Sequence, residues 1–218
     1  MVALARRELS LWWATLDTTD PSAAVAAMES FLPDLVATYG DVAGTVAADW
    51  YDKLRDEAGV RGTYRAMLAD GAPAEQVAAS ARWAVGPLFT DADAAATLDR
   101  LGGAVQRLVQ HGGRATLARN IDADPSGPRW ARVPGGTDVC AWCRMLASRG
   151  AVYLSERSAG GMDRWHDDCN CQPAPVWPDE SLPYDDNALY QQYLDARAKA
   201  GPDPRAITAQ MRTDLGIH

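Results

Sequence analysis

The sequence predicts a mainly α-helical protein: a helical N-terminal domain, a small α+β module with a metal site, and a short helical tail. Two observations predict this class. Apolar residues recur at spacings of three and four along residues 1–120, a pattern typical of amphipathic helices. All four cysteines lie between residues 140 and 171, directly after the run DADPSGPRWARVPGGTD, which is rich in Pro, Gly and Asp and typical of turns. We therefore predict domains over residues 1–124, 125–180 and 181–218.

The N-terminal domain begins with two predicted helices. The first places on one face Ala5, Leu9, Trp12 and Leu16. The second begins at Pro21, which a first helical turn tolerates, with Asp20 as its N-cap. Its apolar stripe continues through Val25, Met28, Leu32, Leu35 and Tyr39. We expect Gly40 and Gly44 to break or join two helices here, with the helical stripe continued by Val46, Trp50 and Leu54.

Two more helices are predicted before residue 124. One opens at Pro73, and a long one begins at Asp91 or Asp93 and carries a stripe of Leu98, Leu101, Val105 and Leu108. On the same long helix an arginine recurs every seven residues, at Arg100, Arg107 and Arg114. Such a row can face phosphates. We favour instead a solvated face opposite the leucines.

The module predicted over 125–180 mixes short strands, a helix and loops. Strands are expected over residues 129–133, 151–154 and 174–177, and a polar loop over 158–168. Thr137 or Asp138 is expected to cap a helix that runs through Ala147 and ends at Gly150. Four tryptophans are expected to form the small core: Trp130, Trp142, Trp165 and Trp177. The tail is expected to form helices over 188–198 and 204–215.

Composition and charge exclude several classes of protein. No window approaches the ~18 uninterrupted apolar residues of a membrane span, so we expect no membrane partner. The N-terminus lacks the order of basic, apolar and small residues that marks a secretory signal peptide. The net charge of −8 argues against a general nucleic-acid coat, although most of it lies in residues 1–125 and the cysteine module is nearly neutral.

The strongest motif is C-x2-C, followed after 22 residues by H-x2-C-x-C. Zinc takes four thiolate or imidazole ligands at tetrahedral positions, and a two-residue spacer lets two thiolates face one ion. Five candidate ligands are available for four places: Cys140, Cys143, His166, Cys169 and Cys171. We favour Cys140, Cys143, His166 and one or both of the last two cysteines as ligands of a structural zinc.

Other readings of the cysteines stay open. Two disulfides, or a redox pair of Cys140 and Cys143, fit the same residues, although a redox C-x-x-C is expected in a βαβ context that this sequence does not show. A zinc hydrolase or nuclease needs an open coordination position. A third interpretation of the motif is a zinc module that binds nucleic acid. Because five protein ligands are available, a closed site is favoured, and we predict that the chain is not an enzyme.

The module also resembles a known family. The string RWARVPGGTDVCAWCRMLASRGAVYLSE and the later WHDDCNCQPAPVW resemble the C-terminal module of the phage Mu F-type head-morphogenesis family, the minor capsid proteins, especially in versions from phages of actinobacteria. The matching positions are Thr137, Cys140, Cys143, Gly150, His166, Cys169 and Cys171. Asp167 and Asp168 replace the usual Pro-Asn, and Asn170 replaces the usual Arg. The resemblance covers about residues 126–178.

The resemblance implies a minor component of the phage head. Proteins of that family act in head assembly or in DNA packaging and delivery. It therefore implies the portal and/or the major capsid protein as partners, with packaged DNA as a further contact. The implied location is the interior of the virion head, and the host cytoplasm during assembly. The resemblance leaves the oligomeric state open.

Overall fold

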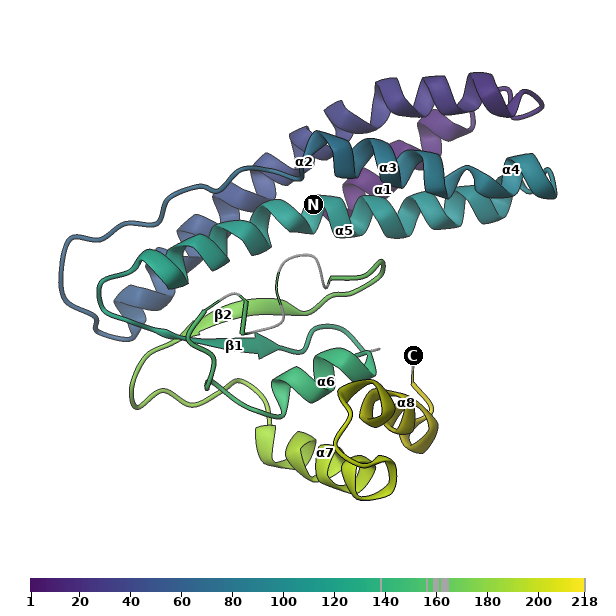
Figure 1. Ribbon diagram of the computed structural model, residues 1–218. Coiled ribbons are helices and arrows are strands. Elements are labelled where there is room, and N and C mark those ends of the chain that lie inside the picture. Colours follow the sequence, from purple (N-terminus) through teal and green to yellow (C-terminus); the bar gives the residue numbers. More distant parts are fainter. Residues whose placement is uncertain (138, 156, 159–160, 162–164, 218) are drawn as a thin grey trace. The chain divides into compact units, whose positions relative to one another are not determined.

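The computed structural model describes residues 1–137, 139–155, 157–158, 161 and 165–217 (Figure 1). The chain is mainly helical with a small two-stranded sheet, which confirms the predicted class. None of the helices in this described part of the chain is long and apolar enough to cross a membrane.

The elements follow one another in the order shown in Figure 1. They are α1 (Val2–Trp13), α2 (Pro21–Glu57), α3 (Ala74–Ala84), α4 (Gly86–Thr90), α5 (Ala94–Ala123), β1 (Arg129–Val133), α6 (Ala141–Ala147), β2 (Gln172–Val176), α7 (Asp186–Ala200) and α8 (Pro204–Leu215).

The chain divides into two compact units. The helical unit comprises residues 1–50, 66–116 and 165–168. The cysteine unit comprises residues 51–65 and 117–164 together with residues 169–218. The long helices α2 and α5 therefore each contribute to both units, and the tail packs within the cysteine unit. That the predicted parts 1–124, 125–180 and 181–218 fold as separate domains stays a prediction.

The core of the helical unit comes from apolar stripes on α1, α2, α3 and α5. On α5 the predicted positions Leu101, Val105 and Leu108 are all buried. The helix starts are capped as expected. A carboxylate oxygen of Asp20 accepts the backbone N–H groups at the start of α2, and a carboxylate oxygen of Asp93 does the same for α5.

Helix α2 runs without interruption through Gly40 and Gly44, so the predicted break there is wrong. The glycines mark a close approach to α5 instead. A Cβ atom at Gly112 would collide with the carbonyl oxygen of Gly40, and one at Gly113 would lie 3.2 Å from the carbonyl oxygen of Ala43. A glycine costs a helix about 1 kcal/mol relative to alanine, and packing between helices offsets that cost.

The arginine row on α5 is not a solvated face, so that expectation is wrong. Arg114 is fully buried, and its guanidinium carbon lies 4.0 Å from the ring centroid of Trp165. Arg107 donates from Nε to Asp167 across 2.7 Å. Only Arg100 is exposed, where it lies 5.2 Å over the Trp83 ring. The segment over residues 165–168 thus covers the face that periodicity alone assigned to solvent.

The sheet of the cysteine unit is an antiparallel pair of β1 and β2, close to the predicted strands. Pro173 and Pro175 of β2 face Arg132 and Trp130 of β1. Proline has no N–H, so it is tolerated where a strand's N–H would point away from its partner. The register agrees, because the N–H of Trp130 also points away and donates to the carbonyl of Tyr153 across 2.9 Å.

Two local predictions in this unit are wrong. The strand expected over residues 151–154 reduces to an isolated bridge between Tyr153 and Trp130. Helix α6 begins at Ala141 with Cys140 as its N-cap, and Thr137 does not cap it. The alternative cap, Asp138, lies outside the described residues, as does part of the loop predicted over 158–168.

Helices α6, α7 and α8 share a second core. Its buried members are Ala141, Met145, Tyr193, Ala196, Ile207 and Met211. Asp185 and Asp203 cap α7 and α8 by accepting backbone N–H groups at 2.9 and 3.0 Å. The two tail helices confirm the predicted ones, and α8 has the predicted bounds because a proline opens it and a left-handed glycine ends it.

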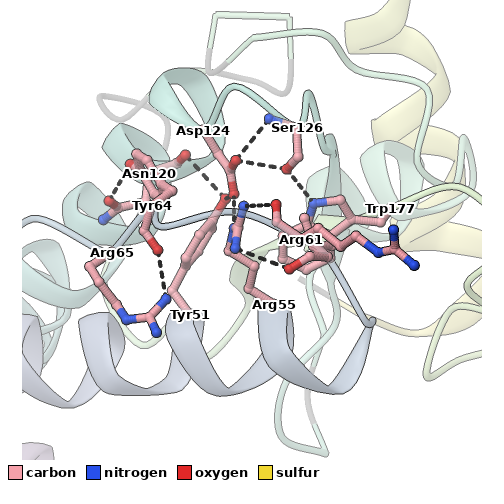
Figure 2. A network of polar contacts seen from close by, with 10 residues as sticks. Tyr51, Arg55, Arg61, Tyr64, Arg65, Asn120, Asp124, Ser126 and Trp177 are labelled. Atoms are coloured by element: carbon pink, nitrogen blue, oxygen red, sulfur yellow. Dashed lines mark hydrogen bonds and ion pairs between the residues drawn. The ribbon is translucent and has the colours of Figure 1, made fainter.

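A buried polar network joins the ends of α2 and α5 within the cysteine unit (Figure 2). One carboxylate oxygen of Asp124 accepts hydrogen bonds from Tyr51 at 3.1 Å and from Arg55 at 2.9 Å. The other accepts the hydroxyl and the N–H of Ser126. The Ser126 oxygen in turn accepts the indole N–H of Trp177 at 2.9 Å. Every oxygen of this buried carboxylate therefore has a partner.

The predicted tryptophan core is correct only in part. Trp130 and Trp177 are buried in the cysteine unit, whereas Trp142 is half-buried. Trp165 is buried too, but it belongs to the helical unit, over Arg114.

Candidate metal centre

The first two cysteines stand at the start of α6. Cys140 is the N-cap, in an extended conformation, and its Sγ accepts the N–H of Cys143 at 3.4 Å. This is the side-chain cap that usually comes from Ser, Thr, Asp or Asn, here supplied by sulfur. The cap turns the Cys140 thiol back toward the first helical turn, where Cys143 lies.

The other two cysteines stand directly before β2. Cys171 precedes Gln172, the first residue of the strand. Gly135 lets this segment approach the loop between β1 and α6, because a Cβ atom there would collide with the carbonyl oxygen of Asn170. Gly136 follows with a φ of +76°, which glycine adopts without strain. Two adjacent glycines thus admit the Cys169–Cys171 turn beside the start of α6.

Three thiols meet at one point. The Sγ atoms of Cys143, Cys169 and Cys171 all lie within 4.8 Å of one another. Cys143 and Cys169 are 3.7 Å apart, far beyond the ~2.05 Å of a disulfide. Four sulfurs around zinc at about 2.3 Å would stand about 3.8 Å apart along each edge of the tetrahedron. The observed separation therefore suits thiolates that share one ion.

The thiols are buried and lie beside one positive charge. All four cysteines are at most 5% exposed. Nη1 of Arg132, a buried residue of β1, lies 3.6 Å from Sγ of Cys143. A zinc ion with four thiolates carries two net negative charges, so a guanidinium at this distance offsets part of the cost of burying them. Arg132 is the residue that our sequence reasoning missed, and its only signal was its place in the predicted strand.

Neighbouring thiols and burial raise the pKa values of two cysteines of the cluster. Hydrogen bonds with the thiols of Cys140, Cys169 and Cys171 raise the pKa of Cys143, and burial raises it further. The hydrogen bond from Cys143 lowers the pKa of Cys171, but the one with Cys169 and burial outweigh it and raise that pKa to about 11. Without an ion, these raised pKa values keep the thiols of Cys143 and Cys171 protonated at pH 7, so a metal must displace their protons.

The fifth predicted ligand, His166, belongs to the helical unit. Its Nδ1 lies 2.6 Å from the carbonyl oxygen of Asp167. It borders an open pocket of about 420 Å³ together with Ser80, Trp83 and Arg107. The role of His166 as a ligand stays a prediction, whereas Cys143, Cys169 and Cys171 form a group that is able to hold a metal.

The family model for the VG15 protein matches residues 1–196, which include the chain from α1 to most of α7 and the whole cysteine motif. The chain belongs to the VG15 protein family. Neither this description nor the names of the relatives below state an enzymatic activity.

Two curated relatives of this VG15-family chain come from mycobacteriophages. The Gene 15 protein of Mycobacterium phage D29 is 31% identical over 146 residues, and that of Mycobacterium phage L5 is 27% identical over 154 residues. Each match covers 52% of both chains, so the chain spans about half the length of these relatives. These relatives confirm a phage protein family, whereas membership in the Mu F-type head-morphogenesis family stays a prediction. No solved structure matches.

Proposed function

We propose that this VG15-family protein is a minor structural protein of the phage head. In this role it associates with the portal and/or the major capsid protein, inside the head, and acts in head morphogenesis, DNA packaging or delivery. Two findings support the proposal: the phage relatives, and the resemblance of residues 126–178 to the minor capsid module. The observation that carries it is the cluster of buried thiols, because it gathers the residues on which that resemblance depends.

We further propose that the thiols hold a structural zinc ion, with Cys140, Cys143, Cys169 and Cys171 as ligands. Cys143 lies at the centre, since its thiol contacts those of the other three. The separation of 3.7 Å between Cys143 and Cys169 supports a shared tetrahedral ion. In the competing assignment, His166 takes the place of one cysteine.

A structural role fits the burial of the site better than a catalytic one. A catalytic zinc keeps one coordination position open to water or substrate, whereas a structural zinc is closed by protein. Cys143 and Cys171 are each 1% exposed, and Arg132 covers the cluster from β1. The metal would tie together α6, the loop before it and the start of β2.

Elemental analysis of the purified full chain tests the zinc proposal. We expect about one zinc per chain in the wild type and almost none in Cys143→Ser. Cys140→Ser should also lose the metal, while His166→Ala should keep it. Loss of zinc in His166→Ala, with retention in Cys140→Ser, would support the competing assignment. A wild-type chain without metal and without titratable thiols would overturn the zinc proposal.

Fractionated virions test the head role separately. Heads and tails are separated after mild disruption, and the protein is measured in each by mass spectrometry. We expect it in heads and in portal-containing assembly intermediates. Its presence in tails alone, or its absence from virions and from all assembly intermediates, would overturn the proposal whatever the zinc content.

A further inference from the structure

An open pocket in the cysteine unit lies apart from the thiol cluster. It has a volume of about 390 Å³ and lies between α6 and the segment that joins α7 to α8. Much of its lining is apolar, from Met145, Leu146, Pro202, Pro204 and Ile207. Met145 and Ile207 also belong to the core shared by α6, α7 and α8, so the pocket is walled by fixed elements of the fold.

The charged residues of this pocket are all of one sign. Arg149 and Arg197 line it, and none of its lining residues is acidic. Both arginines are exposed, and the described residues offer neither of them an ion pair within 4.0 Å. This is notable in a chain with a net charge of −8, where carboxylates outnumber basic groups. The pocket therefore presents apolar surface beside two guanidinium groups that form no ion pair with the part of the chain that the structure describes.

Arg149 is held in place at the pocket. Nη2 of Arg149 donates to the hydroxyl of Tyr193 at 3.1 Å, and its guanidinium lies 4.8 Å over the Tyr193 ring. One of its five N–H donors is used in this way, and the others stay available to an acceptor. A guanidinium already oriented by stacking loses less side-chain entropy when it binds a carboxylate.

We propose that this pocket binds an extended acidic peptide segment of a partner protein. An apolar side chain of that segment occupies the floor over Met145 and Ile207, and neighbouring carboxylates pair with Arg149 and Arg197. Guanidinium groups bind carboxylates with two parallel hydrogen bonds, which gives both affinity and orientation. The inference goes beyond the head role and is independent of the metal, because none of the pocket residues is a cysteine.

A peptide fits this pocket better than a nucleic acid. Single-stranded nucleic acids bind by stacking bases on free aromatic faces beside basic groups. Of the two tyrosines that line the pocket, Tyr193 has Arg149 over its ring and Tyr190 stacked against it, with centroids 5.9 Å apart and an interplanar angle of 19°. The ring is therefore already engaged, and the apolar floor suits a leucine-sized side chain.

Titration of the ¹⁵N-labelled full chain with a synthetic peptide tests the proposal. The probe is the acetylated and amidated hexapeptide Glu-Asp-Leu-Leu-Asp-Glu, and the matched neutral peptide replaces its acidic residues by Gln and Asn. We expect saturable shifts of amide resonances around the pocket with the acidic peptide. The neutral peptide should bind at least about tenfold more weakly, because it loses the charge-assisted hydrogen bonds.

Variants locate the binding site. The double variant Arg149→Gln with Arg197→Gln should weaken acidic-peptide binding at least about tenfold, and the control Arg212→Gln, an exposed arginine of α8 outside the pocket, should not. Both variants must keep the wild-type spectrum away from the substitutions. Equal affinity for the two peptides, no saturable shifts, or an unaffected double variant would overturn the proposal. Displacement of the peptide by an oligothymidylate would indicate a nucleic-acid site instead.

Discussion

Nε of Arg55 donates a hydrogen bond across 2.9 Å to Oδ2 of Asp124, and the two side chains are 2% and 0% exposed. The partners are 69 residues apart in the sequence, one near the end of α2 and the other just after α5. Arg55 also donates to the carbonyls of Val60 and Arg61, so it fixes the chain that leaves α2 as well. This ion pair is the centre of the network in Figure 2.

Breaking the pair from one side should be costly. In Arg55→Met the carboxylate of Asp124 stays buried without its cation, so we expect the free energy of unfolding to fall by about 3–5 kcal/mol. Urea unfolding followed by tryptophan fluorescence measures this. The control is Lys53→Met, which removes the exposed Lys53–Glu57 pair and should change stability by less than about 1 kcal/mol. A loss below about 1 kcal/mol in Arg55→Met would contradict the prediction.

Asp124 should also make the free energy of unfolding depend on pH in the acidic range. Burial raises the pKa of this carboxyl, but hydrogen bonds from Ser126, Arg55 and Tyr51 outweigh it, and the net pKa is lowered. A carboxyl whose pKa is lower in the folded state stabilises above its unfolded pKa of about 3.9 and loses that contribution as pH falls. We expect the urea midpoint to fall more steeply from about pH 5 to pH 3 in the wild type than in Asp124→Asn. Parallel curves would contradict this.

Because α2 and α5 pack closely, alanine substitutions at two glycines that contact each other should have opposite effects on stability. Gly112→Ala places a methyl group against the carbonyl oxygen of Gly40, so the helices must separate, and we expect a loss of about 2 kcal/mol or more. At Gly40→Ala the nearest atom is 3.9 Å away, so the better helix propensity should stabilise by up to about 1 kcal/mol. Thermal unfolding of both variants gives the comparison. Equal effects would show that the helices do not meet here.

Arg132 should raise the affinity of the site for its metal without being a ligand. If zinc binds as proposed, Arg132→Gln removes the guanidinium beside Cys143, and we expect metal affinity to fall about 10- to 100-fold with stoichiometry unchanged. Competition with a chromophoric chelator measures the affinity. Arg129→Gln on the same strand is the control, since Arg129 is exposed and should leave affinity unchanged. Equal affinities for both variants would show that Arg132 only packs.

Much of the fold follows from local signals in the sequence. Helix α8 has the predicted bounds because Pro204 and Gly216 mark its ends directly. Helix α5 is predicted by the spacing of its apolar residues and by Asp93, which caps its start. The continuity of α2 could not be predicted in this way, because a glycine that breaks a helix and a glycine that lets two helices touch look alike until the second helix is placed.

Contacts between distant segments explain the remaining errors. Arg114 lies opposite the leucine stripe of α5, which predicts solvent, and it is buried because Trp165 arrives from a segment far along the chain. The pairing of Arg55 with Asp124 has no local signal at all. At the candidate site, the structure brings together Cys143, Cys169 and Cys171, which are three of the five candidates that the spacing offered, whereas the approach of Arg132 depends on the register of β1 with β2.

The two prolines of β2 have a consequence for crowded conditions. Pro173 and Pro175 remove two backbone donors from the outer side of this strand, which leaves only their carbonyl acceptors and makes that side a poor template for a strand of another molecule. On the other side of the sheet, the N–H of Trp130 is already used by Tyr153. A two-stranded sheet protected in this way resists edge-to-edge aggregation even where many copies accumulate at high local concentration.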